Sequence, residues 1–323
     1  MKIIQVIIIL LTTLYLFSCT NPYEGEGGWQ EDWIATINST GDSLNYITKD
    51  YLGGVQFIPD TTTILINRGS AGIWTMNIDG TDIKCINDSA NTGYEIPCIS
   101  SDGTKIVFSD GDVYTMNIDG TNLQCLTYTP DVIDRYPHFS PDGSQIVYTT
   151  ILDTFYSIYV IEENGSNKRK IISNINVGRY TYPIFSSNGE KIYYHLSGGQ
   201  ERGLYLFNLV DSTNTILFNG NTLFNPISTS EDGSKVVFST SYIVYIINTD
   251  DMLINELFNE SDNARISNDA NKVVFDGIGI INSDGTEQKW LAKGRNPVFS
   301  SDGEKIVFIA EREFPENKSI VSP

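Results

Sequence analysis

The sequence predicts an all-β protein in which a repeated four-stranded unit closes into a ring, the architecture of a β-propeller. Three observations predict it: an internal repeat of about 40 residues, Asp-Gly or Asn-Gly turns within the repeats, and abundant strand and turn formers. The 323 residues include 27 Gly, 18 Tyr and 15 Phe, but 4 Met and 2 His. With 40% hydrophobic and 19% charged residues, this is the composition of a folded protein. It fits neither a helical bundle nor a histidine-rich metal enzyme.

The first half of the repeat reads as a strand, a tight turn and a second strand. Its clearest copy is Pro137–Tyr148, with the sequence PHFSPDGSQIVY. Asp-Gly supplies the positive φ angles that a two-residue hairpin turn requires. Second strands such as Ile106–Phe108 are apolar on both faces, as expected for a sheet packed between two others. Further copies span residues 55–66 in degenerate form, 97–108, 183–194, 226–238, 264–275 and 297–308.

The second half of the repeat is also a predicted hairpin, and its copies define how the ring closes. The clearest is Val113–Thr127, with the sequence VYTMNIDGTNLQCLT, and relatives begin near Ile73, Ile158, Leu204, Val244 and Ile278. A seventh copy, Ile34–Thr48, stands alone at the beginning, and the first-type hairpin 297–308 stands alone at the end. We therefore predict one domain over residues 33–310, with seven four-stranded blades, one of them completed by pairing of the N- and C-terminal hairpins. Six blades is the alternative, if the degenerate copy is not a blade.

These patterns resemble the WD40-like (PD40) repeats of the TolB propeller over nearly all of residues 33–310. The resemblance implies the fold specifically and the function weakly, because such repeats also occur in polysaccharide lyases and in propellers attached to peptidases. TolB itself carries an α/β domain before a six-bladed propeller and binds the peptidoglycan-associated lipoprotein. The stretch between Cys19 and Trp33 has no room for that domain. A TolB-like propeller is expected, and not a TolB orthologue.

Residues 1–18 predict a lipoprotein signal peptide. Lys2 precedes the apolar run Ile3–Phe17, which is shorter than the roughly 20 residues of a membrane-spanning helix. The next residues complete Leu16–Cys19, which resembles a lipobox and implies that Cys19 becomes the lipidated N-terminus. The alternative is an ordinary secretory signal with an incidental cysteine. We expect a lipoprotein of the bacterial cell envelope, anchored in a membrane through Cys19 alone, on the periplasmic face or at the cell surface.

The flanking segments and the remaining cysteines complete the predicted organisation. Residues 19–32 are expected to form a flexible tether, and residues 311–323 a polar C-terminal tail. Three cysteines remain, so they cannot all pair internally. Cys85 and Cys125 occupy equivalent repeat positions and are predicted to be free, buried thiols. A single bridge formed by Cys98 is the alternative.

The formal net charge of −19 and the sequence pI near 4.4 affect the choice of partners. An acidic surface repels phosphate backbones, so nucleic acid is not an expected partner. The charge is compatible both with a solvated outer surface and with a basic partner. It does not decide between them.

The face on which successive blades connect is the predicted functional surface. In similar propellers the first strand of each blade starts on this face, and the Asp-Gly turns lie on the opposite one. Aromatic and arginine side chains near these starts suit recognition of an envelope protein, a peptide or a glycan. The alternative is that the tyrosines only pack between blades. The candidate ligand-binding residues are Tyr94, Glu95, Arg135, Tyr136, His138, Tyr180, Tyr182, Arg202 and Arg295.

A carbohydrate-active enzyme, either a polysaccharide lyase or a hydrolase, is the alternative function. It would use His138 and His195, with Glu201 as a further metal ligand. Two histidines are too few for the site of three His and one Gln that holds manganese in oligogalacturonate lyases, which this chain resembles in architecture. No G-x-S-x-G motif and no attached hydrolase region are present. We therefore expect a non-catalytic binding module without a cofactor or a resident metal.

Overall fold

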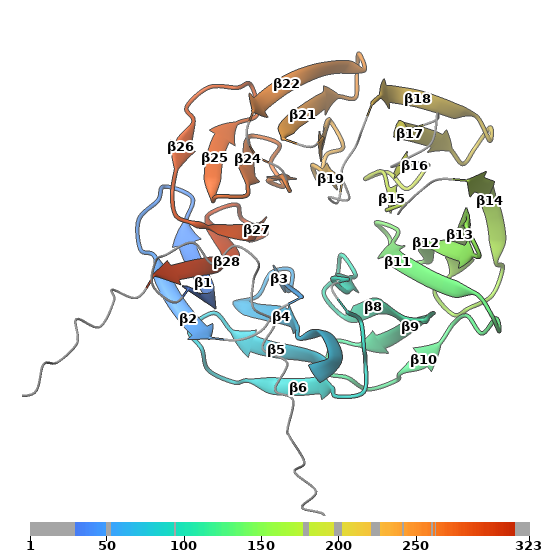
Figure 1. The fold of residues 1–323 in the computed structure, drawn as a ribbon, viewed down its shortest axis with the longest axis horizontal. Helices are drawn as coiled ribbons and strands as arrows, with labels where there is room; N and C mark the ends of the chain where they lie inside the picture. The colour runs from blue at the N-terminus through green and yellow to red at the C-terminus, as the bar shows by residue number, and fades with distance from the viewer. Residues whose placement is uncertain are drawn as a thin grey trace, which may run out of the picture. The chain divides into compact units, whose positions relative to one another are not determined.

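In the computed structural model, seven four-stranded sheets, within the residues described, stand as blades around a common axis (Figure 1). The structure describes residues 30–49, 53–93, 95–176, 181–196, 202–220, 227–240, 242–259, 261 and 263–313. The chain divides into the unit Glu31–Arg312 and a second unit of the two terminal segments, Met1–Gln30 and Glu313–Pro323. Of the terminal unit, Gln30 and Glu313 alone are described. The predicted signal peptide, Cys19 and the predicted tail lie outside the described residues.

The first four blades each use four consecutive strands, ordered from the axis outwards. Blade 1 consists of β3 (Gly54–Phe57), β4 (Thr63–Asn67), β5 (Ile73–Asn77) and β6 (Lys84–Asn87). Blade 2 consists of β7 (Cys98–Ile99), β8 (Lys105–Asp110), β9 (Asp112–Asn117) and β10 (Gln124–Cys125). Blade 3 consists of β11 (Ile133–Phe139), β12 (Gln145–Leu152), β13 (Phe155–Glu162) and β14 (Arg169–Asn176). Blade 4 consists of β15 (Ile184–Phe185), β16 (Lys191–Leu196), β17 (Gly203–Asn208) and β18 (Asn214–Asn219).

The remaining blades follow the same order, except that the last one uses both ends of the described chain. Blade 5 consists of β19 (Ser228–Thr229), β20 (Lys235–Ser239), β21 (Ile243–Asn248) and β22 (Leu253–Asn259). Blade 6 consists of β23 (Arg265–Ile266), β24 (Lys272–Phe275), β25 (Gly279–Asn282) and β26 (Lys289–Trp290). Blade 7 consists of β27 (Gly294–Phe299), β28 (Lys305–Glu313), β1 (Gln30–Asn38) and β2 (Asn45–Lys49). The predicted seven blades and their closure by the two terminal hairpins are confirmed.

The core lies between the blades, because each second strand is covered on both faces. Ile106 and Val107 of β8 are neighbours in sequence, and both are fully buried. Ile106 packs in a cluster with Ile58, Leu65 and Ile73 of blade 1. Val107 packs on the other face with Phe139, Ile146 and Tyr148 of blade 3. Alternating side chains of one strand thus fill two successive interfaces, which explains why these strands are continuously apolar.

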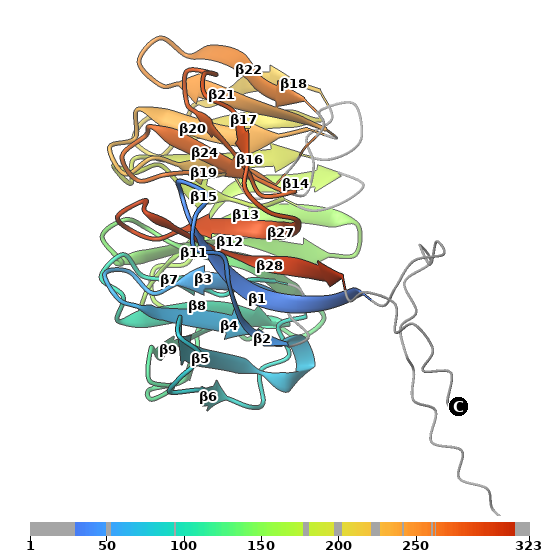
Figure 2. The same ribbon diagram turned by 90° about the vertical axis from the view of Figure 1, so that its left-hand side faces the viewer.

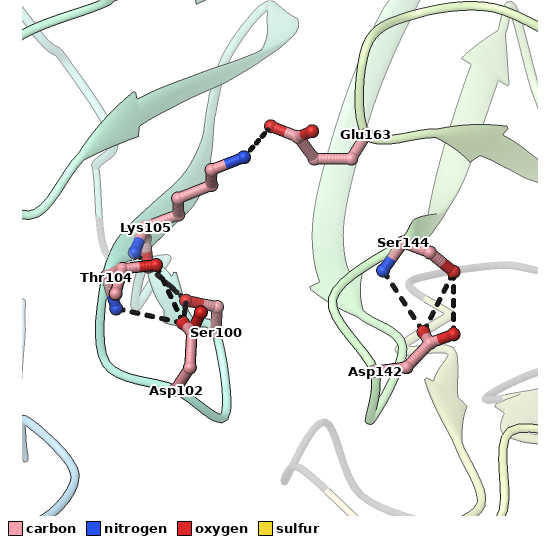
Figure 3. Close-up of polar contacts among 7 residues, drawn as sticks. All are labelled: Ser100, Asp102, Thr104, Lys105, Asp142, Ser144 and Glu163. Atoms are coloured by element: carbon pink, nitrogen blue, oxygen red, sulfur yellow. Dashed lines mark hydrogen bonds and ion pairs between the residues drawn. The ribbon is translucent and has the colours of Figure 1, made fainter.

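The Asp-Gly turns are held by their own side chains, and Figure 3 shows two of them. Asp102 Oδ1 accepts hydrogen bonds from Ser100 Oγ at 2.7 Å, Thr104 N at 3.0 Å and Thr104 Oγ1 at 2.8 Å. The bond from Ser100, followed by those from Thr104, lowers the pKa of the Asp102 carboxyl. The loop is longer than the predicted two-residue turn: Gly103 N donates to Ser100 O, and Gly103 has a φ of 70° while Asp102 does not have a positive φ. The aspartate is retained because it accepts these hydrogen bonds within the turn.

Contacts at this end of the strands also join neighbouring blades. Lys105 Nζ lies 2.6 Å from Glu163 Oε1 of blade 3 (Figure 3). Lys235 Nζ of blade 5, at the equivalent position, lies 2.5 Å from Ser283 Oγ of blade 6. Because the lysine starts the second strand of one blade and its partner directly follows the third strand of the next, the bond ties two blades together.

The cysteines differ in part from the prediction. Cys85, Cys98 and Cys125 are all free, which confirms that part. Cys85 and Cys125 are exposed, however, so their predicted burial is wrong. Both lie on outermost strands, β6 and β10, beyond which no further strand covers the sheet. Among the described residues the helical segment is the short 3-10 turn η1 (Gly69–Ala71), and no helix there has the length and apolar character needed to span a membrane.

Candidate functional site

The two faces of the ring follow from the alternation of strand direction. The innermost and third strands run one way and the second and outermost strands run the other (Figure 2). Both kinds of Asp-Gly turn therefore lie on one face, which we call the turn face. The segments that lead into each innermost strand lie on the opposite face, which we call the connecting face. The structure places the start of β11 and the end of β16 on the connecting face.

A β-bulge shapes the start of β11. Arg135 pairs with Thr149 while His138 pairs with Val147, so one extra residue is inserted between them. Tyr136 takes a φ of 57°, and Pro137 has no N–H to offer. The freed N–H of Tyr136 donates to Glu95 Oε2 of blade 2 at 3.1 Å. The bulge is therefore fixed by a carboxylate of the preceding blade.

The same bulge recurs at the start of β27. Arg295 pairs with Ile309 while Val298 pairs with Val307, and Asn296 takes a φ of 54°. Its N–H donates to Asp276 Oδ1 of blade 6 at 2.7 Å. The Arg-x-Pro sequence thus builds one local structure twice, each time anchored by an acidic residue of the blade before.

Glu95 is the centre of the polar contacts on blades 2 and 3. Its carboxylate accepts hydrogen bonds from Arg135 Nη1 at 2.7 Å, from Tyr136 N and from Ser109 Oγ. The Glu95 side chain is 11% exposed, against 41% for Arg135. Burial raises the pKa of the Glu95 carboxyl above its usual value, although Ser109, the Tyr136 N–H and Arg135 oppose the rise. Burial acts to lower the pKa of the Arg135 guanidinium, but the charges and hydrogen bonds of Glu95 and Tyr136 together outweigh that effect, and the net pKa is raised. Because Arg135 is already bonded to the Glu95 carboxyl group, it meets a ligand as part of a pair.

A row of three rings continues from this pair into blade 4. The ring centroids of Tyr136 and Tyr182 are 4.0 Å apart, and those of Tyr182 and His195 are 5.4 Å apart. Tyr136 and His195 are buried, while Tyr182 is half-buried. Burial lowers the pKa of His195 to about 4, so the imidazole is neutral at pH 7. The three rings therefore form a row without a net charge, of which Tyr182 is the most exposed member.

His195 occupies a position whose equivalents in blades 2 and 3 are hydrogen-bonded. It follows the buried aromatic residue of the second strand, as do Ser109 in blade 2 and Thr149 in blade 3. Ser109 Oγ donates to Glu95, and Thr149 Oγ1 donates to Thr181 O at 3.0 Å. His195 Nε2 and Ser239 Oγ, in the adjacent blades 4 and 5, are buried and have no hydrogen-bond partner among the residues described. These two buried polar atoms therefore lack the hydrogen bonds that their equivalents in blades 2 and 3 make.

The structure brings together four of the predicted residues and separates the others. Glu95, Arg135, Tyr136 and Tyr182 form the cluster above. Arg295 instead binds Asp32 Oδ1 and Oδ2 of β1 at 2.9 and 2.6 Å, so it links the two chain ends in blade 7. The segment before β17 carries Arg202, which is exposed. Tyr94 and Tyr180 lie outside the described residues.

The two histidines of the alternative enzyme site have different surroundings. His195 stacks on Tyr182, whereas His138 Nδ1 lies 2.8 Å from Phe139 O. Within the part of the chain that the structure describes, no three His, Cys, Asp or Glu side chains gather to hold a metal ion. Glu201, the third proposed ligand, lies outside that part.

The turn face carries a cavity, away from this cluster. It has a volume of about 400 Å³ and is lined by blades 6 and 7. Lys272 Nζ lies 3.4 Å from Ser39 Oγ at its wall. The cavity is formed by turn residues that bind one another, so the connecting-face cluster is the better candidate. The lining residues are Asn38, Ser39, Thr40, Ser267, Asp269, Lys272, Asp302, Gly303, Glu304 and Lys305.

Sequence reasoning missed three participants: Asp32, Ser109 and the stacking of His195. Two of the contacts join equivalent repeat positions of adjacent blades, namely Glu95 with Arg135 and Tyr136 with Tyr182. The repeat spacing therefore contained a signal for these contacts. The contact of Arg295 with Asp32 depends on closure of the ring and has no such spacing.

Comparison with known proteins identifies the fold. No family model matches the sequence, and no curated protein is similar to it. Among solved structures, an oligogalacturonate lyase in complex with manganese is similar with a TM-score of 0.66 and 12% identity, covering 90% of this chain and 98% of that one. A putative TolB from Agrobacterium tumefaciens has a TM-score of 0.55 and 18% identity, over 89% of this chain and 100% of that one. An oligogalacturonate lyase from Vibrio parahaemolyticus has a TM-score of 0.56 and 13% identity, over 84% and 81%. At these identities the likeness concerns the fold, and together with the seven blades it shows that the chain is a β-propeller similar in fold to TolB and to the oligogalacturonate lyases.

Proposed function

We propose that this propeller is a non-catalytic binding module of the bacterial cell envelope, anchored through Cys19, that holds a protein, peptide or glycan on its connecting face. The observation that carries the proposal is the cluster of Glu95, Arg135, Tyr136, Tyr182 and His195. Arginine and aromatic side chains are the residues that most often dominate binding energy at interfaces. Here they are pre-organised, because the bulge and the Glu95 carboxylate fix the positions of Arg135 and Tyr136 before any partner arrives.

The charge state of the cluster supports binding more than catalysis. His195 is buried and neutral, and it has no carboxylate among its described contacts to orient it as a general base. Arg135 is paired, which suits recognition of polar or hydrogen-bonding groups. The alternative, a polysaccharide lyase or hydrolase, is favoured by the likeness in fold to the oligogalacturonate lyases.

The test compares two double variants, each of which removes the ion pair of one of the two equivalent arginines. Glu95→Gln/Arg135→Gln removes the pair in the cluster, and Asp32→Asn/Arg295→Gln removes the pair in blade 7. Each variant deletes both charges together, so neither leaves a buried charge alone. Crosslinking capture from envelope extracts, and binding to a glycan panel, are measured for both variants and the wild type at equal thermal stability.

We expect the partner to be lost from the cluster variant and retained by the blade 7 variant. Equal retention by both would contradict the choice of cluster. Turnover of a polysaccharide in the same panel, dependent on added manganese and lost in His195→Phe, would support the enzyme alternative instead.

A further inference from the structure

The turn-face cavity lies at the interface between blades 6 and 7, on the face opposite the binding cluster. Its volume of about 400 Å³ is in the range of small-molecule pockets. The turn that follows β1 lines it with Ser39 and Thr40, and Lys272 of β24 lines it from blade 6. Lys289 Nζ of blade 6 donates to Thr40 O, so this turn is held against blade 6. A small ligand would therefore meet a fixed wall.

Blade 3 shows which group the position of Ser39 can hold. The residue after a third strand donates its backbone N–H to the residue before the second strand of its own blade. The pairs are Glu163 with Ser144, Ser283 with Asn271, and Ser39 with Glu304. Glu163, Ser283 and Ser39 are therefore equivalent, and each faces a lysine that starts the second strand of the preceding blade.

The three lysine contacts differ in length. Lys105 Nζ lies 2.6 Å from Glu163 Oε1 (Figure 3), and Lys235 Nζ lies 2.5 Å from the equivalent serine. Lys272 Nζ lies 3.4 Å from Ser39 Oγ, and its ammonium group has no other hydrogen bond or ion pair among the described residues. An ammonium group binds a carboxylate more strongly than a neutral oxygen. A ligand carboxylate beside Lys272 would take the place that Glu163 takes beside Lys105.

The lining carries charges of both signs, and none of the described residues that form it has an apolar side chain. The carboxylates are those of Asp269, Asp302 and Glu304, and the ammonium groups are those of Lys272 and Lys305. A simple anion would be repelled by the carboxylates and by the formal net charge of −19. A simple cation would leave Lys272 without a carboxylate. A ligand with one carboxylate, one ammonium group and no net charge suits both signs.

Glu304 is the carboxylate that remains for the ammonium group of such a ligand. Asp269 accepts a hydrogen bond from Ser267 Oγ at 2.6 Å, and Asp302 accepts one from Ser300 Oγ at 2.5 Å. These bonds are the largest causes of the lowered pKa of each aspartate, so both carboxylates are engaged as anions within their turns. The Glu304 side chain is exposed and, within the part of the chain that the structure describes, has no hydrogen bond or ion pair.

The structure assigns to this cavity a small zwitterion of the α-amino acid class, whose carboxylate binds Lys272 and whose ammonium group binds Glu304. Ser39 and Thr40 offer hydroxyl groups for further hydrogen bonds. The polar lining favours a short side chain, because a large apolar one would gain little by burial against it. The cavity lies on the other face of the ring from the binding cluster, so it does not depend on the proposed function.

The experiment uses three probes that differ by one charged group. L-Alanine carries both groups, propionate lacks the ammonium group, and ethylammonium lacks the carboxylate. Each probe is titrated into the full chain at pH 7 and low salt, and its dissociation constant is measured by ligand-observed NMR. We expect L-alanine to bind about tenfold more tightly than either of the other probes, because it alone makes both charged contacts.

Variants of the lining residues assign the two contacts. Lys272→Met should weaken the binding of L-alanine by about tenfold without weakening that of ethylammonium. Glu304→Gln should weaken the binding of L-alanine by about tenfold without weakening that of propionate. Ser39→Glu introduces the side chain that blade 3 has at Glu163, so it should abolish the binding of L-alanine. Thermal unfolding shows that each variant is folded.

Lys191→Met is the control for the loss of one positive charge. Lys191 starts the second strand of blade 4, at the position equivalent to Lys272, and does not line the cavity. Its replacement should leave the binding of L-alanine unchanged. The inference is overturned if L-alanine shows no saturable binding, if propionate or ethylammonium binds as tightly, or if folded Lys272→Met binds L-alanine as the wild type does.

Discussion

Glu95 and Arg135 stand at the same position of two adjacent blades and form an ion pair of 2.7 Å across the interface between them. The carboxylate is the more buried partner, and it also fixes the N–H of Tyr136. The pair therefore joins two functions in one contact: it sets the geometry of the bulge and it balances the charge of the arginine.

Removing one partner of this pair should be more harmful than removing both. We expect Arg135→Ala to lower the free energy of unfolding by about 2–3 kcal/mol, because it leaves the buried Glu95 carboxylate without its cation. Glu95→Gln/Arg135→Gln should lower it by less than the single variant. Urea unfolding measures both. A double variant as unstable as the sum of its single variants would show that the two side chains are not coupled.

The pH dependence of stability should reveal the buried His195. Its pKa is about 4 in the folded chain against 6.5 in the unfolded one. Because the folded chain favours the neutral imidazole, the contribution of His195 to the free energy of unfolding is complete above pH 6.5. It is lost as the pH falls towards 4. Between pH 7 and pH 5 we expect a loss of about 2 kcal/mol from this group.

The variant His195→Phe keeps a ring against Tyr182 but cannot titrate. It should lose about 2 kcal/mol less than the wild type over the same interval, as measured by urea unfolding at the two pH values. An equal loss of the free energy of unfolding in the wild type and in His195→Phe would mean that His195 is not buried.

Replacing either of two turn glycines, Gly120 or Gly143, by alanine should destabilise the protein to a different extent. Gly120 and Gly143 both have positive φ angles, 84° and 71°. A Cβ at Gly120 would lie 2.2 Å from Ile86 O of the neighbouring blade, whereas a Cβ at Gly143 has no atom within 4 Å. We expect Gly143→Ala to be destabilising by about 1 kcal/mol and Gly120→Ala by about 3 kcal/mol. Equal shifts in melting temperature would contradict the close approach of the two blades.

Replacing Ser140 of the Asp-Gly turn should lower the stability of the protein more than replacing the exposed Ser144. Ser140 is 5% exposed, donates to Asp142 Oδ1 at 2.6 Å and accepts from Gln145 N at 2.9 Å. We expect Ser140→Ala to lower stability by about 1–2 kcal/mol, because it leaves the Gln145 N–H without its acceptor. Ser144→Ala, on the exposed side of the same carboxylate, should change stability by less than about 0.5 kcal/mol. Chemical denaturation of the two variants checks this order.

Acid should reduce the effect of replacing Ser140. The bond from Ser140 is the largest cause of the lowered pKa of Asp142. A lowered carboxyl pKa stabilises the fold at pH values above the unfolded-state pKa. This stabilisation is lost as the pH falls through the folded-state pKa. Ser140→Ala should therefore destabilise the protein more at pH 7 than at pH 3. An equal effect at both pH values would show that the contact does not favour the ionised carboxyl.

The fold could be predicted from the sequence because each blade repeats the same hairpins. The two unpaired hairpins, Ile34–Thr48 and 297–308, were enough to predict the closure of blade 7. The turn length was predicted wrongly because Asp-Gly also suits a longer loop in which the aspartate accepts hydrogen bonds, as Asp102 does. The burial of Cys85 and Cys125 was predicted wrongly because a repeat position does not reveal whether its strand is covered by another.

The candidate site was predictable only in part. The residues of the connecting face could be selected by their place before each first strand, which gave Glu95, Arg135, Tyr136 and Tyr182. Their contacts could not, because they depend on which side chains face one another across a blade interface. Arg135 and Glu95 are 40 residues apart, one repeat, whereas Arg295 and Asp32 are 263 residues apart and meet only in the closed ring.

The shared seventh blade also imposes an order on assembly. β1 and β2 are made first but find their neighbour β28 only after the other six blades have been synthesised. Until then β1 has an edge that no neighbouring strand occupies, and such an edge can pair with other chains. The pairing of β1 with β28 joins segments at opposite ends of the sequence, and contacts of this range slow folding. A chaperone that shields the β1 edge until β28 has been synthesised would therefore raise the yield of closed rings without altering their final stability.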